Sequence, residues 1–153
     1  MPSSTDRIER EIFLKASRSR VWRALVNAEE FGTWFGVGLK GTQFVAGQRV
    51  KGQITYPGYE HLTFDVLVER IEPGRLISFR WHPAAVDAAF DYSKEPSTLV
   101  VFELKEAKGG ILLTVVESGF DQIPPSRREE AFRMNSGGWT IQMENIEKHV
   151  AKP

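Results

Sequence analysis

Glu117 is the residue of this sequence whose type and position could do acid–base chemistry. It follows Leu113 and Val115 at alternate positions of a segment with a strand-like pattern, so its carboxylate belongs to the apolar face. A carboxylate in an apolar interior is disfavoured as an anion unless it is paired, so Glu117 is a candidate general base or a polar anchor for a ligand. Two alternatives stay open: Glu117 lies at the exposed end of the strand, or it pairs with a nearby arginine.

The three histidines do not have the spacing of a metal site. His61, His82 and His149 form neither His-x-His nor His-x-x-x-His, and the chain has no cysteine. His82, beside Trp81, is a second candidate catalytic residue or a hydrogen-bond donor to a ligand, and the alternative is that it is solvated. Glycine-rich phosphate and dinucleotide motifs are also lacking. We therefore expect no metal and no cofactor.

The aromatic residues could pack together as an ordinary core, or several could line a pocket with few polar groups. Asn135 and Gln142 share a helical face with apolar residues and would supply polar groups to such a pocket, or otherwise bond backbone edges. The candidate ligand-binding residues are Trp34, Phe35, Phe64, Phe79, Trp81, Phe102, Val115, Glu117, Phe120, Asn135, Trp139, Gln142 and Met143.

A long helix over residues 126–150 must position part of this set. Apolar residues recur there at steps of three and four, while charged residues fall on the opposite face. Ser126 is the predicted N-cap, with Glu129 completing a capping box. Gly137 and Gly138 interrupt the pattern, and each costs about 1 kcal/mol relative to alanine in a helix. They indicate a kink or a close approach of backbone to sheet, or room for a ligand beside Trp139.

The rest of the chain is predicted to form a sheet with two short helices near its start. Residues 8–14 alternate as a first strand, and residues 19–26 and 28–34 follow as helices, the first capped by Ser17. Residues 40–117 read as short antiparallel strands with one apolar face and one polar face, which includes Ser78. Residues 82–96 form a long loop, a candidate rim or lid. We expect one domain over 1–153, with residues 1–7 mobile.

The composition excludes several classes of partner. Twenty basic and twenty acidic residues balance, so we expect no binding to nucleic acid or to an anionic membrane surface. No apolar run reaches the roughly 18 residues of a membrane-spanning helix, so we expect no membrane insertion. The start of the chain lacks a secretory signal, which together with the absence of cysteine favours a cytoplasmic location.

The order of these elements and a set of short motifs resemble a known superfamily. The order is strand, two short helices, antiparallel strands and a long final helix, as in the helix-grip fold. The sequence resembles the START-like (SRPBCC) superfamily, and within it the branch similar to the C-terminal domain of the activator of heat-shock protein 90 ATPase. The motifs are Val21-Trp22, Trp34-Phe35-Gly36, Pro73-Gly74-Arg75-Leu76, Phe79-Arg80-Trp81, Glu117-Ser118-Gly119-Phe120 and Gly137-Gly138-Trp139.

The resemblance implies an α+β fold in which a curved antiparallel sheet wraps the final helix and leaves an apolar cavity between them. It favours a non-enzymatic protein that binds an aromatic, polyketide-like or lipid-like small molecule. Independently of the resemblance, we expect a monomer or a homodimer. One alternative is a small cyclase- or hydratase-type enzyme in which Glu117 and His82 move protons. Another is a chaperone-accessory module that binds a protein partner. Because one fold hosts many functions, the site must decide among them.

Overall fold

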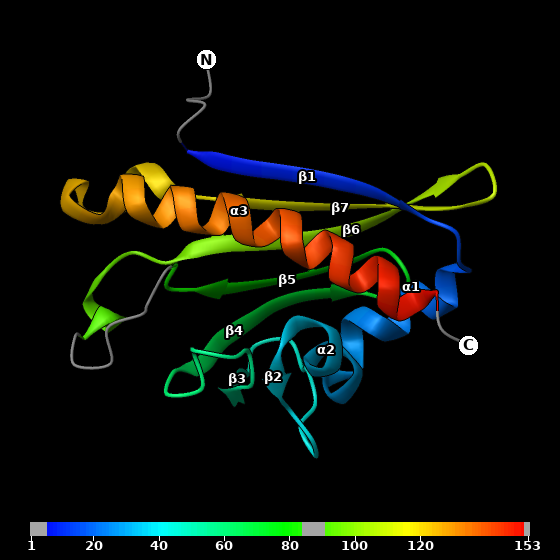
Figure 1. Ribbon diagram of the computed structural model, residues 1–153, viewed down its shortest axis with the longest axis horizontal. Coiled ribbons are helices and arrows are strands. Elements are labelled where there is room, and N and C mark those ends of the chain that lie inside the picture. Colours follow the sequence, from blue (N-terminus) through cyan, green and yellow to red (C-terminus); the bar gives the residue numbers. More distant parts are fainter. Residues whose placement is uncertain (1–5, 84–90, 152–153) are drawn as a thin grey trace.

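A computed structural model describes residues 6–83 and 91–151 of the chain. One seven-stranded antiparallel sheet carries the long helix α3 along one face, with α1 and α2 beside the C-terminal half of that helix (Figure 1). The elements are β1 Arg7–Leu14, α1 Arg18–Val26, α2 Ala28–Phe35, β2 Val37–Gly38, β3 Arg49–Ile54, β4 Thr63–Glu72, β5 Leu76–Trp81, η1 Tyr92–Lys94, β6 Thr98–Ala107, β7 Gly110–Ser118, η2 Phe120–Gln122 and α3 Pro125–Val150.

The strand order β1-β7-β6-β5-β4-β3-β2 confirms the predicted α+β helix-grip fold. Alternate residues of β4, β6 and β7 are buried, as expected for a sheet with one face against a core. Ser78 is a correction, because it is only 2% exposed although it was predicted on the solvated face. Its cross-strand neighbours are Arg70 and Val101, whose longer side chains flank its short one.

The ladder between β4 and β5 does not extend to the first residues of β4. It starts at the pair Leu67 and Arg80 and shifts register between Val68 and Arg70. The first four residues of β4 therefore pair with β3 and not with β5. The sheet is open at this point, beside the end of β5.

The two short helices form as predicted, within one residue. Ser17 caps α1 by accepting a hydrogen bond from the Arg20 amide at 3.2 Å. Asn27 ends α1 and caps α2, and the second helix ends at Gly36, whose φ of 99° favours glycine. The Trp34 indole donates to the Ala24 carbonyl at 2.8 Å, which fixes the angle between the helices.

The start of α3 differs from the prediction. The helix begins at Pro125 with Pro124 in the N-cap position, and no side chain caps it. Proline suits the first helical position because its φ is already helical and it has no N–H to satisfy. Ser126 is therefore inside the first turn, and the predicted capping box with Glu129 is wrong. Downstream, α3 runs through Gly137 and Gly138 without a break.

Residues 6 and 7, the last two of the segment predicted to be mobile, lie against the end of β7. Arg7 is the first residue of β1, and the Asp6 carbonyl accepts hydrogen bonds at 3.1 Å from the amides of Gly119 and Phe120. These bonds hold Asp6 and Arg7 against the end of β7, whereas residues 1–5 lie outside the described residues. Residues 84–90 of the predicted rim or lid also lie outside them.

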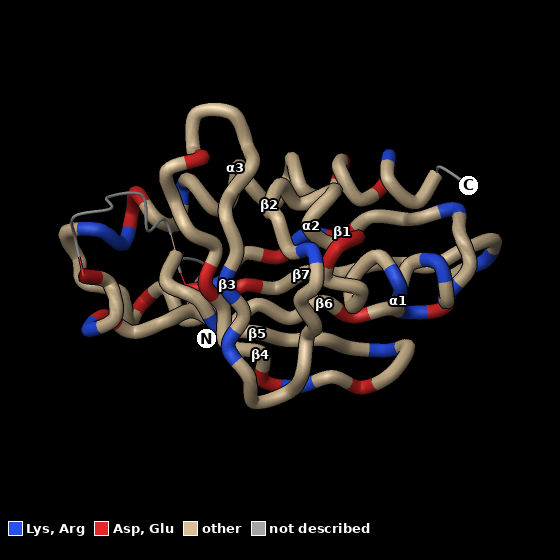
Figure 2. Tube along the Cα trace, turned by 90° about the horizontal axis from the view of Figure 1, so that it is seen from below, with Lys and Arg blue, Asp and Glu red and all other residues tan. Residues whose placement is uncertain are grey.

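Charges are interspersed over the molecule. Figure 2 shows basic and acidic residues alternating along the chain, without a large region of one sign. In the described part of the chain, no helix is both long enough and apolar enough to cross a membrane.

Candidate functional site

Glu117 is the polar centre of the interior. Its side chain is fully buried on β7 and faces α3, as the strand alternation predicted. Each carboxylate oxygen accepts an indole N–H, from Trp81 on β5 at 2.7 Å and from Trp139 on α3 at 2.8 Å. Thr98 on β6 donates at 2.5 Å, and the Asn135 amide lies 2.9 and 3.1 Å from the two oxygens. One carboxylate thus joins three neighbouring strands to the helix.

The donors around Glu117 are neutral. An indole N–H can only donate, so both carboxylate oxygens act as acceptors. No described arginine or lysine pairs with Glu117, and the residue is not at an exposed strand end, so neither sequence-based alternative holds. The hydrogen-bonding groups of this buried side chain are thus paired, as buried polar groups require.

The two indoles that share Glu117 also contact each other. The rings of Trp81 and Trp139 are stacked, with centroids 5.7 Å apart and planes 25° apart. Trp139 also contacts Phe102 edge to face, with ring centroids 5.6 Å apart. Trp81 is only partly buried, so it forms the boundary between the core and the space beyond it.

A second polar contact joins α3 to the edge of the sheet. Arg10 of β1 donates to the Ser136 hydroxyl at 2.7 Å, to the Ser136 carbonyl at 3.1 Å and to the Thr140 hydroxyl at 3.1 Å. This contact gives Ser136 a structural role in the poorly helix-forming segment. The helix is therefore held at Glu117 on one flank and at Arg10 on the other.

A pocket of about 820 Å³ adjoins the partly exposed side of Trp81. It lies beside the residues of β4 that precede the first pair with β5, between the β3–β4 hairpin, the end of α2 and the middle of α3. Five predicted ligand-binding residues line it: Phe35, Phe64, Trp81, Asn135 and Gln142, together with the candidate catalytic residue His82. The wall also includes Ile54, Leu62 and Met134, which are apolar, and the exposed rings of Tyr56 and Tyr59.

The other eight predicted residues do not line this pocket. They are buried in the core behind it, and they are Trp34, Phe79, Phe102, Val115, Glu117, Phe120, Trp139 and Met143. The aromatic set is therefore divided between the two interpretations, since part of it is core and part is pocket wall. Phe35 connects the parts, stacking on buried Phe31 at 4.8 Å and approaching Trp81 at 6.0 Å.

Helical spacing places Gly138 on the same side of α3 as the pocket, although it is not itself one of the residues that line the pocket. It comes three residues after Asn135 and four before Gln142, so the three share one helix face. Gly137 is exposed, whereas Gly138 is half-buried. A Cβ atom added at either glycine would meet nothing within 4 Å. The interpretation as a close approach of backbone to sheet is therefore wrong, and Gly138 leaves open space beside the pocket wall.

The ends of the 82–96 loop form one side of the pocket. His82, Pro83, Asp91, Tyr92 and Ser93 line it. Arg127 of α3 holds both ends, because it bonds the Glu95 carboxylate at 2.7 Å and the Pro83 carbonyl at 3.1 Å.

Asp91 is the acidic group of this side. Hydrogen bonds from the Ser93 hydroxyl and amide, and then the nearby His82, lower the pKa of Asp91 from its usual 3.8. His82 Nδ1 is buried and has no hydrogen-bond partner in the described structure.

The family of the chain follows from a comparison with family models. The model described as "Activator of Hsp90 ATPase homolog 1-like protein" matches residues 15–151. The chain belongs to this family. The resemblance inferred from the sequence is thereby confirmed.

Solved structures share the fold of this Hsp90-activator-like chain at low identity. DynU16, from the dynemicin biosynthetic locus, has a TM-score of 0.73 and 19% identity over 99% of this chain, which covers 48% of that one. A Mesorhizobium loti protein has a TM-score of 0.72 and 23% identity, with 95% and 97% of the two chains covered. The Aha1 dimer from Colwellia psychrerythraea has a TM-score of 0.68 and 14% identity, with 94% and 95% covered. Curated proteins give no match.

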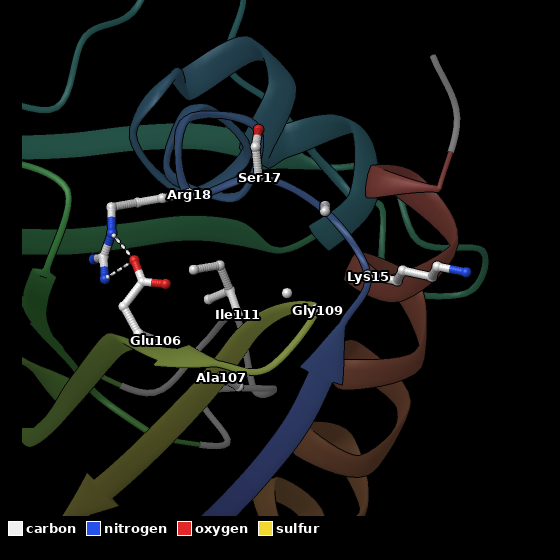
Figure 3. Close-up of a pocket in the computed structure, with 9 residues that line it drawn as sticks. Lys15, Ser17, Arg18, Glu106, Ala107, Gly109 and Ile111 are labelled. Carbon is white, nitrogen blue, oxygen red and sulfur yellow. Dashed lines mark hydrogen bonds and ion pairs between the residues drawn. The ribbon is translucent and has the colours of Figure 1, made fainter.

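A second hollow, of about 480 Å³, lies at the opposite end of this family member, between the start of α1 and the β6–β7 hairpin. An ion pair between Arg18 and Glu106, 2.9 Å apart, spans it, while the side chains of Lys15 and Ser17 point away (Figure 3). Its charged groups are thus paired or directed into solvent, so we place the candidate site at the aromatic pocket. Among the described residues, no three acidic or histidine side chains gather as a metal site would require.

Proposed function

We propose that this protein binds a hydrophobic small molecule with an aromatic body in the pocket beside Trp81. The observation that carries the proposal is the pocket itself. It measures about 820 Å³, and its wall includes Phe35, Phe64, Trp81 and Met134 together with the charged residues Arg49, Lys51 and Asp65. Small-molecule sites commonly have volumes of about 300–1,000 Å³, apolar walls and a few polar groups. Aromatic residues of α2, β4 and β5 line the same space, which suits an aromatic guest.

Gly138 gives independent support. Glycine destabilises a helix interior, and a methyl group would fit at this position without a clash. A helix selected only for packing against the sheet would gain from alanine here. An occupant of the pocket would account for the missing side chain.

The contacts of Glu117 favour binding over proton transfer. Its two oxygens accept hydrogen bonds from the protein, and the residue contributes no atom to the pocket wall. A general base must lie within hydrogen-bond reach of the proton that it removes. Trp81 and Asn135 stand between Glu117 and the pocket, so we assign the carboxylate to positioning and not to catalysis.

The proposal is tested first with the protein purified from its own host. Native mass spectrometry should detect a co-purifying small molecule, and a thermal-shift screen of naphthalene-type compounds should raise the melting temperature, because a ligand of the folded state stabilises it. If nothing co-purifies and no compound raises the melting temperature, the proposal is wrong.

A matched pair of variants then locates the site. Met134→Trp adds a large ring to the pocket wall, whereas Arg133→Trp adds the same ring at the neighbouring exposed position. The first should abolish the thermal shift given by the best compound, and the second should leave it unchanged. Equal loss or equal retention in the two variants would place the compound elsewhere.

A further inference from the structure

We infer that the pocket selects ligands that carry a hydroxyl group, received by the side-chain oxygen of Asn135, and that Glu117 is the positioning residue that fixes this oxygen. The inference rests on the proposed function, since it requires the pocket to bind a ligand. It adds the chemical class of that ligand, an aromatic alcohol or phenol.

The orientation of the Asn135 amide follows from the chemistry of Glu117. The Asn135 nitrogen lies 2.9 and 3.1 Å from the two carboxylate oxygens, each of which already accepts an indole N–H. Rotating the amide by half a turn would bring its oxygen against two acceptors, which repels. The hydrogen-bond network therefore assigns the nitrogen to Glu117 and the oxygen to the other side.

The oxygen of Asn135 is then an acceptor without a donor. Asn135 is half-buried in the pocket wall, and no described group donates to its oxygen. Gln142, the other amide of the wall, differs because both its amide nitrogen and its amide oxygen are hydrogen-bonded within the protein. It donates to the Phe35 carbonyl at 2.9 Å and accepts from Asn145 at 3.1 Å. Asn135 is thus the amide through which the wall can recognise a donor on a ligand.

A hydroxyl also suits His82, one of several polar residues of the wall. His82 Nδ1 is buried and lacks a partner in the described structure, and this nitrogen can donate or accept according to the tautomer. A hydroxyl group can donate to Asn135 and also bond a histidine nitrogen, whereas an ether can only accept. An ether oxygen facing the Asn135 oxygen would leave both without a hydrogen bond.

The position of Asn135 relative to Gly138 gives the direction of the ligand. Residues three apart on a helix are neighbours on its surface. The open space at Gly138 therefore lies next to the acceptor, along the same face. We place the hydroxyl at Asn135 and the aromatic body against Gly138 and Trp81.

The test compares two probes of nearly equal shape, 2-naphthol and 2-methoxynaphthalene, by isothermal titration calorimetry. The wild-type protein should bind the naphthol about threefold to tenfold more tightly, as expected for one neutral hydrogen bond. In Asn135→Leu, which replaces the amide by an apolar group of similar size, the preference should disappear while the methyl ether still binds. Arg133→Leu, at an exposed position of α3 outside the pocket wall, is the control, and it should keep the wild-type preference.

Glu117 is tested separately from the pocket. In Glu117→Gln one carboxylate oxygen becomes an amide donor, so the Asn135 amide is no longer fixed and the preference should fall to about the Asn135→Leu level. A measurement on the wild-type protein stands even if this variant does not fold. The Asn135 side-chain amide, assigned in NMR spectra by its loss in Asn135→Leu, should exchange slowly with solvent because its nitrogen is hydrogen-bonded to the fully buried Glu117 carboxylate. Fast exchange would remove Glu117 from this role.

The outcomes separate this inference from the proposed function. If neither probe nor any other aromatic compound binds, the proposed function fails and this inference fails with it. If both probes bind the wild-type protein equally, the pocket is a binding site without the hydroxyl preference, and only this inference is overturned. A preference that persists in Asn135→Leu would also overturn it.

Discussion

Substitutions at the adjacent residues Gly137 and Gly138 can test helix stability and ligand binding separately. Alanine tests the stability of α3, and leucine tests the affinity for a ligand. Both glycines lie inside α3, and a Cβ atom at either position meets nothing within 4 Å. Replacing glycine by alanine in a helix interior gains up to about 1 kcal/mol, partly by restricting the unfolded chain. Each alanine variant should therefore be more stable than the wild type by about 0.5–1 kcal/mol, or about 1–4 °C in melting temperature.

The two positions should differ once a ligand is present. Gly138 shares the helix face of Asn135 and Gln142 beside the pocket, whereas Gly137 is exposed. Leucine keeps the helix propensity but occupies far more space than a methyl group. Gly138→Leu should weaken binding of an aromatic probe by about tenfold or more, equivalent to at least about 1.4 kcal/mol. Gly137→Leu should leave the affinity unchanged.

Urea denaturation without ligand gives the free energy of unfolding, and calorimetric titration with 2-naphthol gives the affinity for the probe. A Gly138→Ala variant that is less stable than the wild type would contradict the open space at that position. The proposed place of the ligand beside Gly138 is refuted if the leucine variants at the two positions bind the probe alike. Unfolded fractions below the transition must match among the variants, so that a loss of affinity is not a loss of folded protein.

Three further outcomes follow from the contacts of single side chains. In urea denaturation, Glu117→Gln should lower the free energy of unfolding by about 2–4 kcal/mol, because an amide cannot accept from both indoles and leaves a buried donor unpaired. A decrease of less than about 0.5 kcal/mol would contradict the described network. Ser17→Ala should cost about 1 kcal/mol as a lost N-cap, whereas Ser126→Ala, inside the first turn of α3, should be near neutral in the same assay. Burial alone would raise the pKa of Glu30, but hydrogen bonds from His149 and Arg20 and the charges of nearby arginines hold this pKa below its usual 4.5. Glu30 therefore contributes stability that is present above that value and lost as the pH falls below it, so Glu30→Gln should flatten this part of the stability–pH curve.

The strand and helix pattern of the fold could be predicted because it is local. Alternation at Leu113, Val115 and Glu117 determines which face each side chain takes, and steps of three and four in residues 126–150 do the same for α3. The inward direction of Glu117 followed from this rule. Its partners did not, because Trp81 and Thr98 come from strands whose register depends on the whole sheet.

The division of the aromatic residues into core and pocket wall was beyond sequence reasoning for a related reason. Alternation places Phe64, Phe79 and Trp81 on one face of the sheet, but it does not tell where the helix covers that face. The end of the β4–β5 ladder at Leu67 makes the difference, since residues beyond it border an opening. Tyr56 also lines the pocket but was not predicted to do so, because its position next to the Pro57-Gly58 turn indicated only a turn.

Glu117 holds Trp81 and Trp139 together as a stacked pair, and this pair should give a circular dichroism signal that reports on the site. Two indoles stacked 5.7 Å apart couple their electronic transitions, and this coupling gives a near-ultraviolet circular dichroism signal that is sensitive to small changes in separation and angle. The remaining tryptophans, Trp22 and Trp34, belong to α1 and α2. Because one ring belongs to the sheet and the other to the helix, the signal reports the spacing of the two layers. Any molecule that shifts Trp81 should therefore be visible without an added dye.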